Sequence, residues 1–344
     1  MISANDYQYN LPSELIAQEP VEPRDSSRLF VYSISQDTVT FDSFFNLANY
    51  LPQKSFLVMN ETKVLPSRIT LFKDTGGKVN VLFLVNEMTE EGKVEGLVDR
   101  EVHVDQVLRT DFGHSFHVIS QTQNRFTFQF DFKKQELFHI LDVSGRMPIP
   151  PYLKECPLSE TELRKKYQPV TAHDPGSIAA PTASLHFTDT VFETLAQKGI
   201  SHYFITLHVG MGTFAPIGEE AVREKRLHTE WYQIPPETQH AIDQKKQNGE
   251  LLVAVGTTVV RTLESAAEAE ASGNTSLFIY PPYRFQQVDG MLTNFHLPKS
   301  SLLMLVDALL KDKGAKRGIL ELYEVAIQEK FRFFSFGDAM LILP

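Results

Sequence analysis

From residue 200 onward, short apolar runs alternate with helix-like segments, and this alternation limits the possible folds more than any other feature. The apolar runs HYFITLHV, LLVAV and LFIY are separated by PETQHAIDQKKQ and VVRTLESAAEAEA. Gly249 and Gly273 follow the two helix-like segments, and glycine just after a helix is a common stop signal. Strands that alternate with helices favour a parallel sheet covered by helices. We therefore predict an α/β fold with a mostly parallel sheet and flanking helices.

Residues 69–145 carry a different pattern. The runs ITLFK, KVNVLFLV, KVEGLV and RFTFQFDF are separated by the turn signals DTGG and EEG, and the Pro-rich segment RMPIPPYL follows. Short strands between turn signals are typical of a small barrel or sandwich. We expect residues 69–145 to be an inserted β domain, and residues 1–68 and 146–344 to form one discontinuous α/β catalytic domain.

Charge and cysteine content exclude several classes of protein. The 344 residues include 33 basic and 43 acidic side chains, a net charge of -10, which opposes non-specific attraction to nucleic acid or anionic membrane. Any nucleic-acid site must then be a local patch. The apolar runs LLVAV and LLMLV are far shorter than the roughly 18 residues of a membrane helix. The single cysteine, Cys156, excludes an internal disulfide, and with no secretory signal at the N-terminus we expect a cytoplasmic protein.

Common catalytic signatures are absent: the sequence has no GxxxxGK[ST], HExxH, GxSxG or full GxGxxG motif. Polar residues gather instead in segments rich in Gly, Pro and Thr. GSIAAPTASLHFT contains Thr182 and His186, TLHVGMGTF contains His208 before a Gly-x-Gly bend, and LHTEWY contains Glu230. Each histidine has a structural alternative, and Glu230 with its neighbour His228 is equally compatible with a solvated pair.

Two further segments carry polar groups at the ends of expected strands. In VGTTVVRTLES, a strand leads through Gly256 into a helix that carries Arg261. Helix N-termini with hydroxyls bind anions, including carboxylates; the alternative is a Thr N-cap with a surface pair between Arg261 and Glu264 or Glu268. In VDGMLTNFHLPKSSLLMLV, Asn294 and His296 precede a capped helix and need partners inside an apolar frame.

Long motifs run nearly from end to end. They are DYQYNLPSELIAQEPVEPRDSSRLFV, NETKVLPSRI, GRMPIPPYL, YQPVTAHDPGSIAAPTASLHFT, TLHVGMGTF, VGTTVVRTLES, FIYPPYRFQQVDGMLTNFHLP and KFRFFSFGDAML. In this order they resemble the S-adenosylmethionine:tRNA ribosyltransferase-isomerase family of queuosine biosynthesis. The resemblance implies an α/β domain interrupted by a β-barrel.

The resemblance also implies a tRNA-modifying reaction. The family moves the ribosyl part of S-adenosylmethionine onto a 7-aminomethyl-7-deazaguanine base at the tRNA wobble position, leaving epoxyqueuosine and releasing adenine and methionine. S-adenosylmethionine is then a co-substrate and tRNA the partner. We expect a monomer with no metal and no permanently bound cofactor.

The implied chemistry assigns residues to three groups. A carbon beside a sulfonium is acidified, so a modest base can remove its proton, and the attacking amine must also lose one. The catalytic candidates are His186, His208, Glu230, His296 and Asp338. The substrate-binding candidates are Thr182, Gly210, Gly212, Thr213, Gly256, Thr257, Thr258, Arg261 and Asn294. We expect His186 and His208 to lie near one another, because open α/β sheets collect ligands at the carboxyl ends of their strands.

The charge of the inserted segment leaves two alternatives open. Residues 69–145 hold 8 basic and 12 acidic side chains, which does not suit a surface that faces tRNA. One alternative is a transferase of the same fold that acts on a non-tRNA amine; the other is a non-catalytic RNA-binding relative. If tRNA binds, we expect contacts from basic residues outside this segment, namely Arg68, Arg146, Lys311, Lys313, Lys316 and Arg317.

Overall fold

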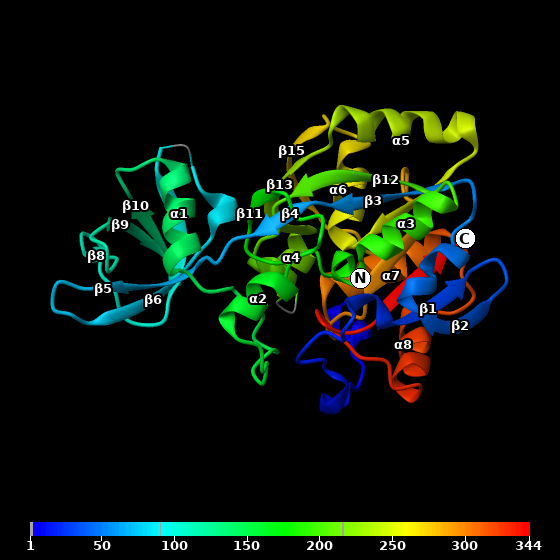
Figure 1. Cartoon of the computed structure of the whole chain (residues 1–344), viewed down its shortest axis with the longest axis horizontal. Helices are drawn as coiled ribbons and strands as arrows, with labels where there is room; N and C mark the ends of the chain where they lie inside the picture. The colour runs from blue at the N-terminus through cyan, green and yellow to red at the C-terminus, as the bar shows by residue number, and fades with distance from the viewer. Residues whose placement is uncertain (1–2, 90, 215–216) are drawn as a thin grey trace.

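The computed structural model describes residues 3–89, 91–214 and 217–344, and a nine-stranded sheet runs through these ranges (Figure 1). The strand order is β15-β13-β12-β3-β14-β16-β17-β1-β2. The bounds are β1 Arg28–Ser33, β2 Thr38–Ser43, β3 Ser55–Asn60, β12 Ser201–Leu207, β13 Arg226–Gln233, β14 Leu251–Val255, β15 Ser272–Leu277, β16 Gly290–Asn294 and β17 Ala339–Leu343.

The sheet is parallel around its centre. The neighbours β12, β3, β14 and β16 run parallel, as do β17 and β1, whereas β13, β15 and β2 pair antiparallel with their neighbours and β17 is antiparallel to β16. Every residue of β3 is buried, as expected for a strand covered on both faces. The predicted α/β class is confirmed.

Helices cover both faces of the sheet. Side chains alternate along β3, so that Phe56 and Val58 pack into one core cluster and Leu57 and Met59 into another. The first cluster also takes apolar residues from α5, α6, α7 and α8, and the second takes them from α3 and the 3-10 helix η4. The helix bounds are α2 Glu160–Lys166, α3 Asp189–Gln197, α4 Glu219–Glu224, α5 Pro236–Asn248, α6 Thr257–Ala266, α7 Ser301–Asp312 and α8 Ile319–Gln328. The 3-10 helices are η1 Ala4–Tyr7, η2 Ser13–Leu15, η3 Arg24–Ser26, η4 Phe44–Asn49, η5 Val85–Glu87, η6 Thr182–His186 and η7 Met211–Phe214.

A closed barrel forms the smaller lobe, drawn mainly in cyan and teal in Figure 1. Its strand order is β10-β7-β6-β5-β8-β9, with bounds β5 Arg68–Phe72, β6 Lys78–Phe83, β7 Lys93–Val98, β8 Val107–Arg109, β9 Ser115–Thr122 and β10 Arg125–Gln129. The buried rings of Phe83, Phe116 and Phe128 fill its core, and α1 (Lys134–Ser144) packs against it. The inserted β unit is therefore a barrel, while the expected domain limits at 69 and 145 stay a prediction.

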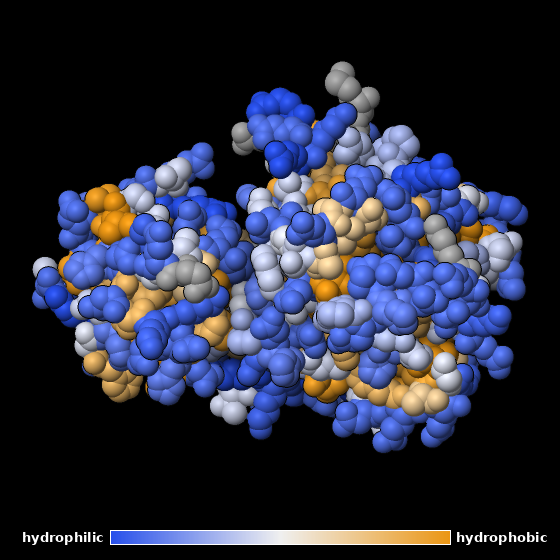
Figure 2. Space-filling view, turned by 90° about the horizontal axis from the view of Figure 1, so that it is seen from above, coloured by the Kyte–Doolittle hydropathy of each residue, from blue (hydrophilic) through white to orange (hydrophobic). Residues whose placement is uncertain are grey.

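A neck joins the two lobes. There β4 (Thr62–Val64) and β11 (Asp174–Ser177) form a parallel two-stranded ladder, and Arg68 forms an isolated bridge with Arg146. Figure 2 shows the lobes side by side, with hydrophilic residues over most of the visible face. In the described part of the chain, no helix combines the length and apolarity needed to cross a membrane.

Candidate active site

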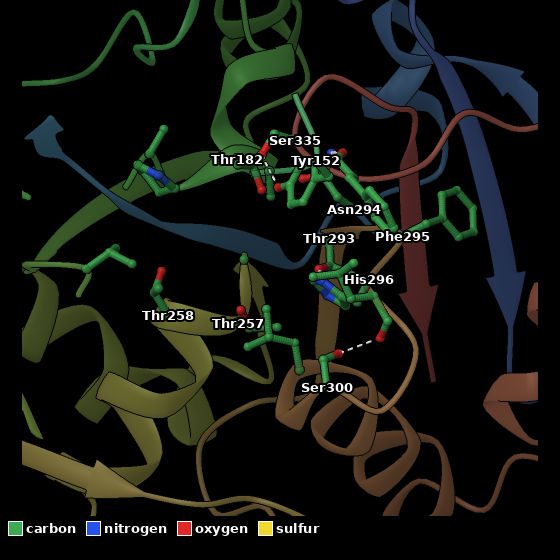
Figure 3. A pocket seen from close by; sticks show the side chains of 18 residues that line it. Tyr152, Thr182, Thr257, Thr258, Thr293, Asn294, Phe295, His296, Ser300 and Ser335 are labelled. Carbon is green, nitrogen blue, oxygen red and sulfur yellow. Dashed lines mark hydrogen bonds between the residues drawn. The ribbon is translucent and has the colours of Figure 1, made fainter. Parts of the chain in front are cut away.

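A pocket opens at the carboxyl ends of β14 and β16, where α6 begins (Figure 3). It holds about 610 Å³ of empty space, part of it open to solvent. The parallel strands β14 and β16 end at the same edge of the sheet, where α/β folds place ligands. The polar side chains on its wall are Tyr152, Thr182, Thr257, Thr258, Thr293, Asn294, His296, Ser300 and Ser335.

The start of α6 presents backbone N–H groups near this pocket. Gly256, the residue before the helix, has a φ of +95°, a conformation that residues with a Cβ rarely adopt. No side chain caps the helix, and Thr257 and Thr258 of its first turn line the pocket. The first N–H groups of a helix have no partner within it and carry partial positive charge. This end of α6 therefore suits an anionic group of a ligand.

Asn294 contributes an unpaired acceptor. Its side chain is buried, and its Nδ2 donates to the carbonyl of Phe334 at 3.3 Å and lies 3.2 Å from Nε2 of His186. Its Oδ1 is buried and has no hydrogen-bond partner within the described ranges. A buried acceptor without a partner costs about 1–3 kcal/mol, so a ligand that donates to Oδ1 gains affinity here.

His186 lies behind the pocket wall and holds Asn294. Its Nδ1 is 2.8 Å from the hydroxyl of Ser27, and its ring stacks on Phe44 with the centroids 5.0 Å apart. Burial lowers the pKa of His186 to about 3, and the charges of Arg332 and Arg24 add to this effect. The ring is therefore neutral at physiological pH, and its contacts make it a positioning residue for the Asn294 amide.

His296 is the catalytic candidate that lines the pocket. Its Nε2 lies 2.9 Å from Oγ1 of Thr293, its backbone N–H donates to the hydroxyl of Tyr323 at 2.8 Å, and its carbonyl accepts from Tyr9. Burial lowers the pKa of His296 to about 3. The imidazole is thus neutral, and the residue is held by three neighbours.

Glu230 and Arg261 form a buried ion pair away from this pocket wall. Both are 5% exposed, and Nη1 of Arg261 contacts Oε2 of Glu230. Oε1 of Glu230 accepts the backbone N–H of Gly210 at 2.7 Å, and Nε of Arg261 donates to the carbonyl of Leu277 at 3.1 Å. The pair thus ties the Gly-x-Gly bend at 210–212 to α6. The surface pair considered from the sequence is wrong, because Arg261 is buried and pairs with Glu230 and not with Glu264 or Glu268.

His208 lies on the barrel side of the sheet. Its Nδ1 is 2.8 Å from Oγ1 of Thr62, its Nε2 is 4.0 Å from Asp174, and its ring stacks on Trp231. Burial lowers its pKa, and the nearby Asp174 carboxylate opposes that shift. The strands that carry His208 and Asn294 are three positions apart in the sheet, about 14 Å at ~4.8 Å per strand. The structure therefore does not bring His208 to the contact between Asn294 and His186.

The remaining candidates divide between the pocket and other places. Thr182 and Gly256 line the pocket, Gly210 and Gly212 lie in the bend beside it, and the side chain of Thr213 falls outside the described residues. Asp338 accepts the backbone N–H groups of Arg28 and Arg332 at 3.1 and 2.7 Å, which is a structural role.

The basic residues expected to contact tRNA lie in two groups. Lys311, Lys313 and Arg317 pair with Asp307, Asp312 and Asp37, at the end of α7 away from the pocket residue Ser300, and Lys316 is exposed beside them. Arg68 and Arg146 lie at the neck and line a surface depression together with Asp99. Their contact with tRNA stays a prediction.

Sequence reasoning missed several wall residues. Tyr152 and Ser335 share a hydrogen bond of 2.7 Å on the pocket wall, although they are 183 positions apart in the chain. Both belong to segments noted for their motifs, GRMPIPPYL and KFRFFSFGDAML, but nothing local indicated that the two would meet. Among the described residues, no group of three or more His, Cys, Asp or Glu side chains is arranged to hold a metal ion.

The protein is thus of the α/β class, with a closed barrel inserted in the chain and a pocket at the carboxyl edge of its large sheet. Within that class, a family model described as queuosine biosynthesis protein matches residues 4–342, and the chain belongs to this family. The crystal structure of S-adenosylmethionine tRNA ribosyltransferase from Thermotoga maritima is similar, with 33% sequence identity and a TM-score of 0.55. The match covers 98% of this chain and 100% of that chain. The expected family is confirmed.

Proposed function

We propose that the protein transfers the ribosyl moiety of S-adenosylmethionine to 7-aminomethyl-7-deazaguanine at the tRNA wobble position, giving epoxyqueuosine-tRNA, adenine and methionine. Membership of the queuosine biosynthesis family and the name of the similar Thermotoga maritima structure support this reaction. The observation that carries the proposal is the pocket itself, which joins a helix N-terminus, an unpaired amide oxygen and a neutral histidine.

The groups of S-adenosylmethionine match the groups on the pocket wall. The methionine carboxylate suits the N–H groups at the start of α6, beside Thr257 and Thr258. Arg261, the other candidate for this carboxylate, pairs with Glu230 and does not line the pocket. Oδ1 of Asn294 suits a donor, either the ammonium or a ribose hydroxyl. The rings of Tyr152 and Phe334, with centroids 4.8 Å apart, offer an apolar surface for adenine.

His296 is the proposed base for the first proton transfer. Because its pKa is about 3, its ring is unprotonated at physiological pH and has a lone pair available. A base of such low pKa removes a proton only from a strongly acidified carbon, and the carbon beside a sulfonium is acidified by the adjacent positive charge. His208, which lies close to Asp174 on the barrel side of the sheet, is the proposed acceptor for the proton of the attacking amine.

Release of adenine tests the reaction. The purified protein is incubated with S-adenosylmethionine and tRNA that carries the aminomethyl-deazaguanine precursor, and adenine is measured by chromatography. We expect adenine in proportion to modified tRNA, and none with tRNA that carries guanine at the same position. If adenine is released with a small free amine but not with tRNA, the protein is a transferase of the same fold that acts on another substrate. The ion pairs of Lys311, Lys313 and Arg317 with acidic residues also favour this alternative, because paired cations attract phosphate less. No adenine in either reaction refutes both and leaves an RNA-binding relative.

A pair of histidine variants tests the assignment of the base. His296→Gln removes the imidazole from the pocket, and we expect turnover to fall by about 100-fold or more. The matched control is His240→Gln, because His240 is exposed on α5 and lies outside the pocket wall. Wild-type turnover in His296→Gln refutes the role of His296.

A further inference from the structure

A second pocket lies where the barrel meets the edge of the large sheet. Asn86, Glu87 and Arg125 line it from the barrel lobe, and His228, Thr229, Trp231 and Asn274 line it from the sheet. Both pockets border the Gly-x-Gly bend, because Val209 lines the first pocket and the next residue, Gly210, faces Asn86 of the second. Ligands in the two pockets would therefore lie near the same bend.

The bend approaches the side chains of this second pocket closely. A Cβ at position 210 would lie 3.0 Å from Nδ2 of Asn86, and one at position 212 would lie 2.7 Å from Cδ2 of His228. Both distances are tighter than ordinary van der Waals contact, so a larger residue at either position would displace the side chain of Asn86 or His228. The bend thus lies directly against two side chains of the second pocket.

Asn86 is the group in this pocket that most clearly lacks a partner. Its Nδ2 and Oδ1 are both buried, and neither has a hydrogen-bond partner in the described part of the chain. Buried polar groups are nearly always paired in folded proteins, and each unpaired one costs about 1–3 kcal/mol. A primary amide offers a donor and an acceptor side by side. The ligand that satisfies both has an acceptor and a donor at the same spacing, as the hydrogen-bonding edge of a nucleobase does.

The neighbouring groups favour a base over a phosphate. Arg125 pairs with two carboxylates, Glu87 at 2.7 Å and Glu95 at 2.9 Å, so one cation faces two anions. The remaining negative charge repels phosphate and attracts N–H donors or an ammonium group. Trp231 adds an aromatic ring, stacked on His208 with the centroids 5.3 Å apart.

We propose that this second pocket receives the aminomethyl-deazaguanine base of the tRNA substrate, with the Asn86 amide paired to its hydrogen-bonding edge. The Glu87 carboxylate attracts the N–H donors of the base or its ammonium, and Trp231 lies beside the ring. The assignment rests on the proposed function. It places the reacting amine next to His208 and beside the bend that borders the S-adenosylmethionine pocket, so that the barrel completes the site.

Trp231 provides a direct measurement, because it is the only tryptophan in the sequence. The full-length protein is titrated, without S-adenosylmethionine, with an anticodon stem-loop RNA that carries the aminomethyl-deazaguanine base, and tryptophan fluorescence is recorded. We expect saturable quenching by this RNA and at least tenfold weaker binding by the same stem-loop with adenine in place of the base. Asn86→Leu should weaken the specific binding at least tenfold and leave S-adenosylmethionine affinity, measured by calorimetry, unchanged. The control is Asn124→Leu, an exposed asparagine in the same lobe.

The outcomes separate this proposal from the proposed function. If the wild-type protein releases adenine but Asn86→Leu binds the RNA as wild type does, the base pocket is wrong and the reaction stands. If the RNA quenches Trp231 and Asn86→Leu abolishes the effect, but no adenine is released, the pocket stands and the reaction is wrong. Equal binding of the modified and adenine-bearing RNA overturns the pocket. Asn86→Ser, which keeps a small polar side chain, should weaken RNA binding too, and it replaces Asn86→Leu if that variant does not fold.

Discussion

His186→Phe removes a titrating group from the interior of the large lobe, and its effect on stability depends on pH in a predictable way. Burial lowers the pKa of His186 from 6.5 to about 3. Below pH 6.5 the unfolded chain binds a proton at this residue that the folded protein does not, so the contribution of His186 to stability is present above pH 6.5 and is lost as the pH falls toward 3. Between pH 8 and pH 5 the loss is about 2 kcal/mol, at 1.36 kcal/mol per pKa unit.

The variant should lose this pH dependence. At pH 8, His186→Phe leaves the hydroxyl of Ser27 without its imidazole partner, which destabilises the fold by about 1–3 kcal/mol. The new ring retains an aromatic neighbour in Phe44. At pH 5 the same substitution should be less destabilising by about 2 kcal/mol, because the wild type has lost that amount and the variant has not. His296, whose pKa is also lowered to about 3, is present in both proteins and cancels from the comparison.

Urea unfolding at the two pH values, followed by Trp231 fluorescence and circular dichroism, measures this difference. The control is His117→Phe, since His117 is exposed on β9. The same destabilisation of His186→Phe at pH 8 and pH 5 would refute a buried, neutral imidazole. The kinetics give a second readout: a misplaced Asn294 amide should weaken S-adenosylmethionine binding more than turnover. A turnover lower by about 100-fold with unchanged affinity would instead make His186 a proton-transfer group.

Two other predictions concern charged residues. Arg261→Met leaves the buried carboxylate of Glu230 without its cation, so the free energy of unfolding, measured by urea denaturation, should fall by about 3–5 kcal/mol. The double variant that adds Glu230→Gln should recover part of this loss, and no recovery would contradict the pairing. Replacing Lys313, Lys316 and Arg317 together by Ala should weaken tRNA binding and reduce the slope of log affinity against log salt concentration. The slope should fall by up to ~0.9 for each phosphate that the variant no longer neutralises. An unchanged slope in a filter-binding titration refutes this patch.

Much of the fold could be predicted because its signals are local. The runs LLVAV and HYFITLHV became β14 and most of β12, and the Thr-Thr sequence after Gly256 became the first turn of α6. Strand order is a different matter. The pairing of β1 with β17 joins the two ends of the chain, and β16 runs antiparallel to β17, so the sheet departs from the regular parallel pattern that βαβ punctuation suggests.

The pocket residues were predictable to the extent that they follow strands directly. Asn294 ends β16, His296 follows it, and Thr257 follows β14 by two positions. Their roles were less predictable, because role depends on partners far away in sequence. His186 meets Ser27 across 159 positions and Asn294 across 108, and only those contacts distinguish a positioning residue from a base.

The buried polar groups of this chain can be ordered by whether the fold itself satisfies them. Glu230 and Asp338 accept hydrogen bonds within the protein, and these bonds hold the bend and the last strand in place. Arg261 donates to Glu230 and to the carbonyl of Leu277, although its Nη2 has no partner among the described residues. The unpaired oxygen of Asn294 and the unpaired amide of Asn86 are different, since no neighbour among the described residues offsets their desolvation. These two groups line two pockets that border the bend at 209–212. A reaction between two substrates, one held by the sheet and one by the barrel, accounts for both unpaired groups, whereas a single ligand in the first pocket accounts only for Asn294.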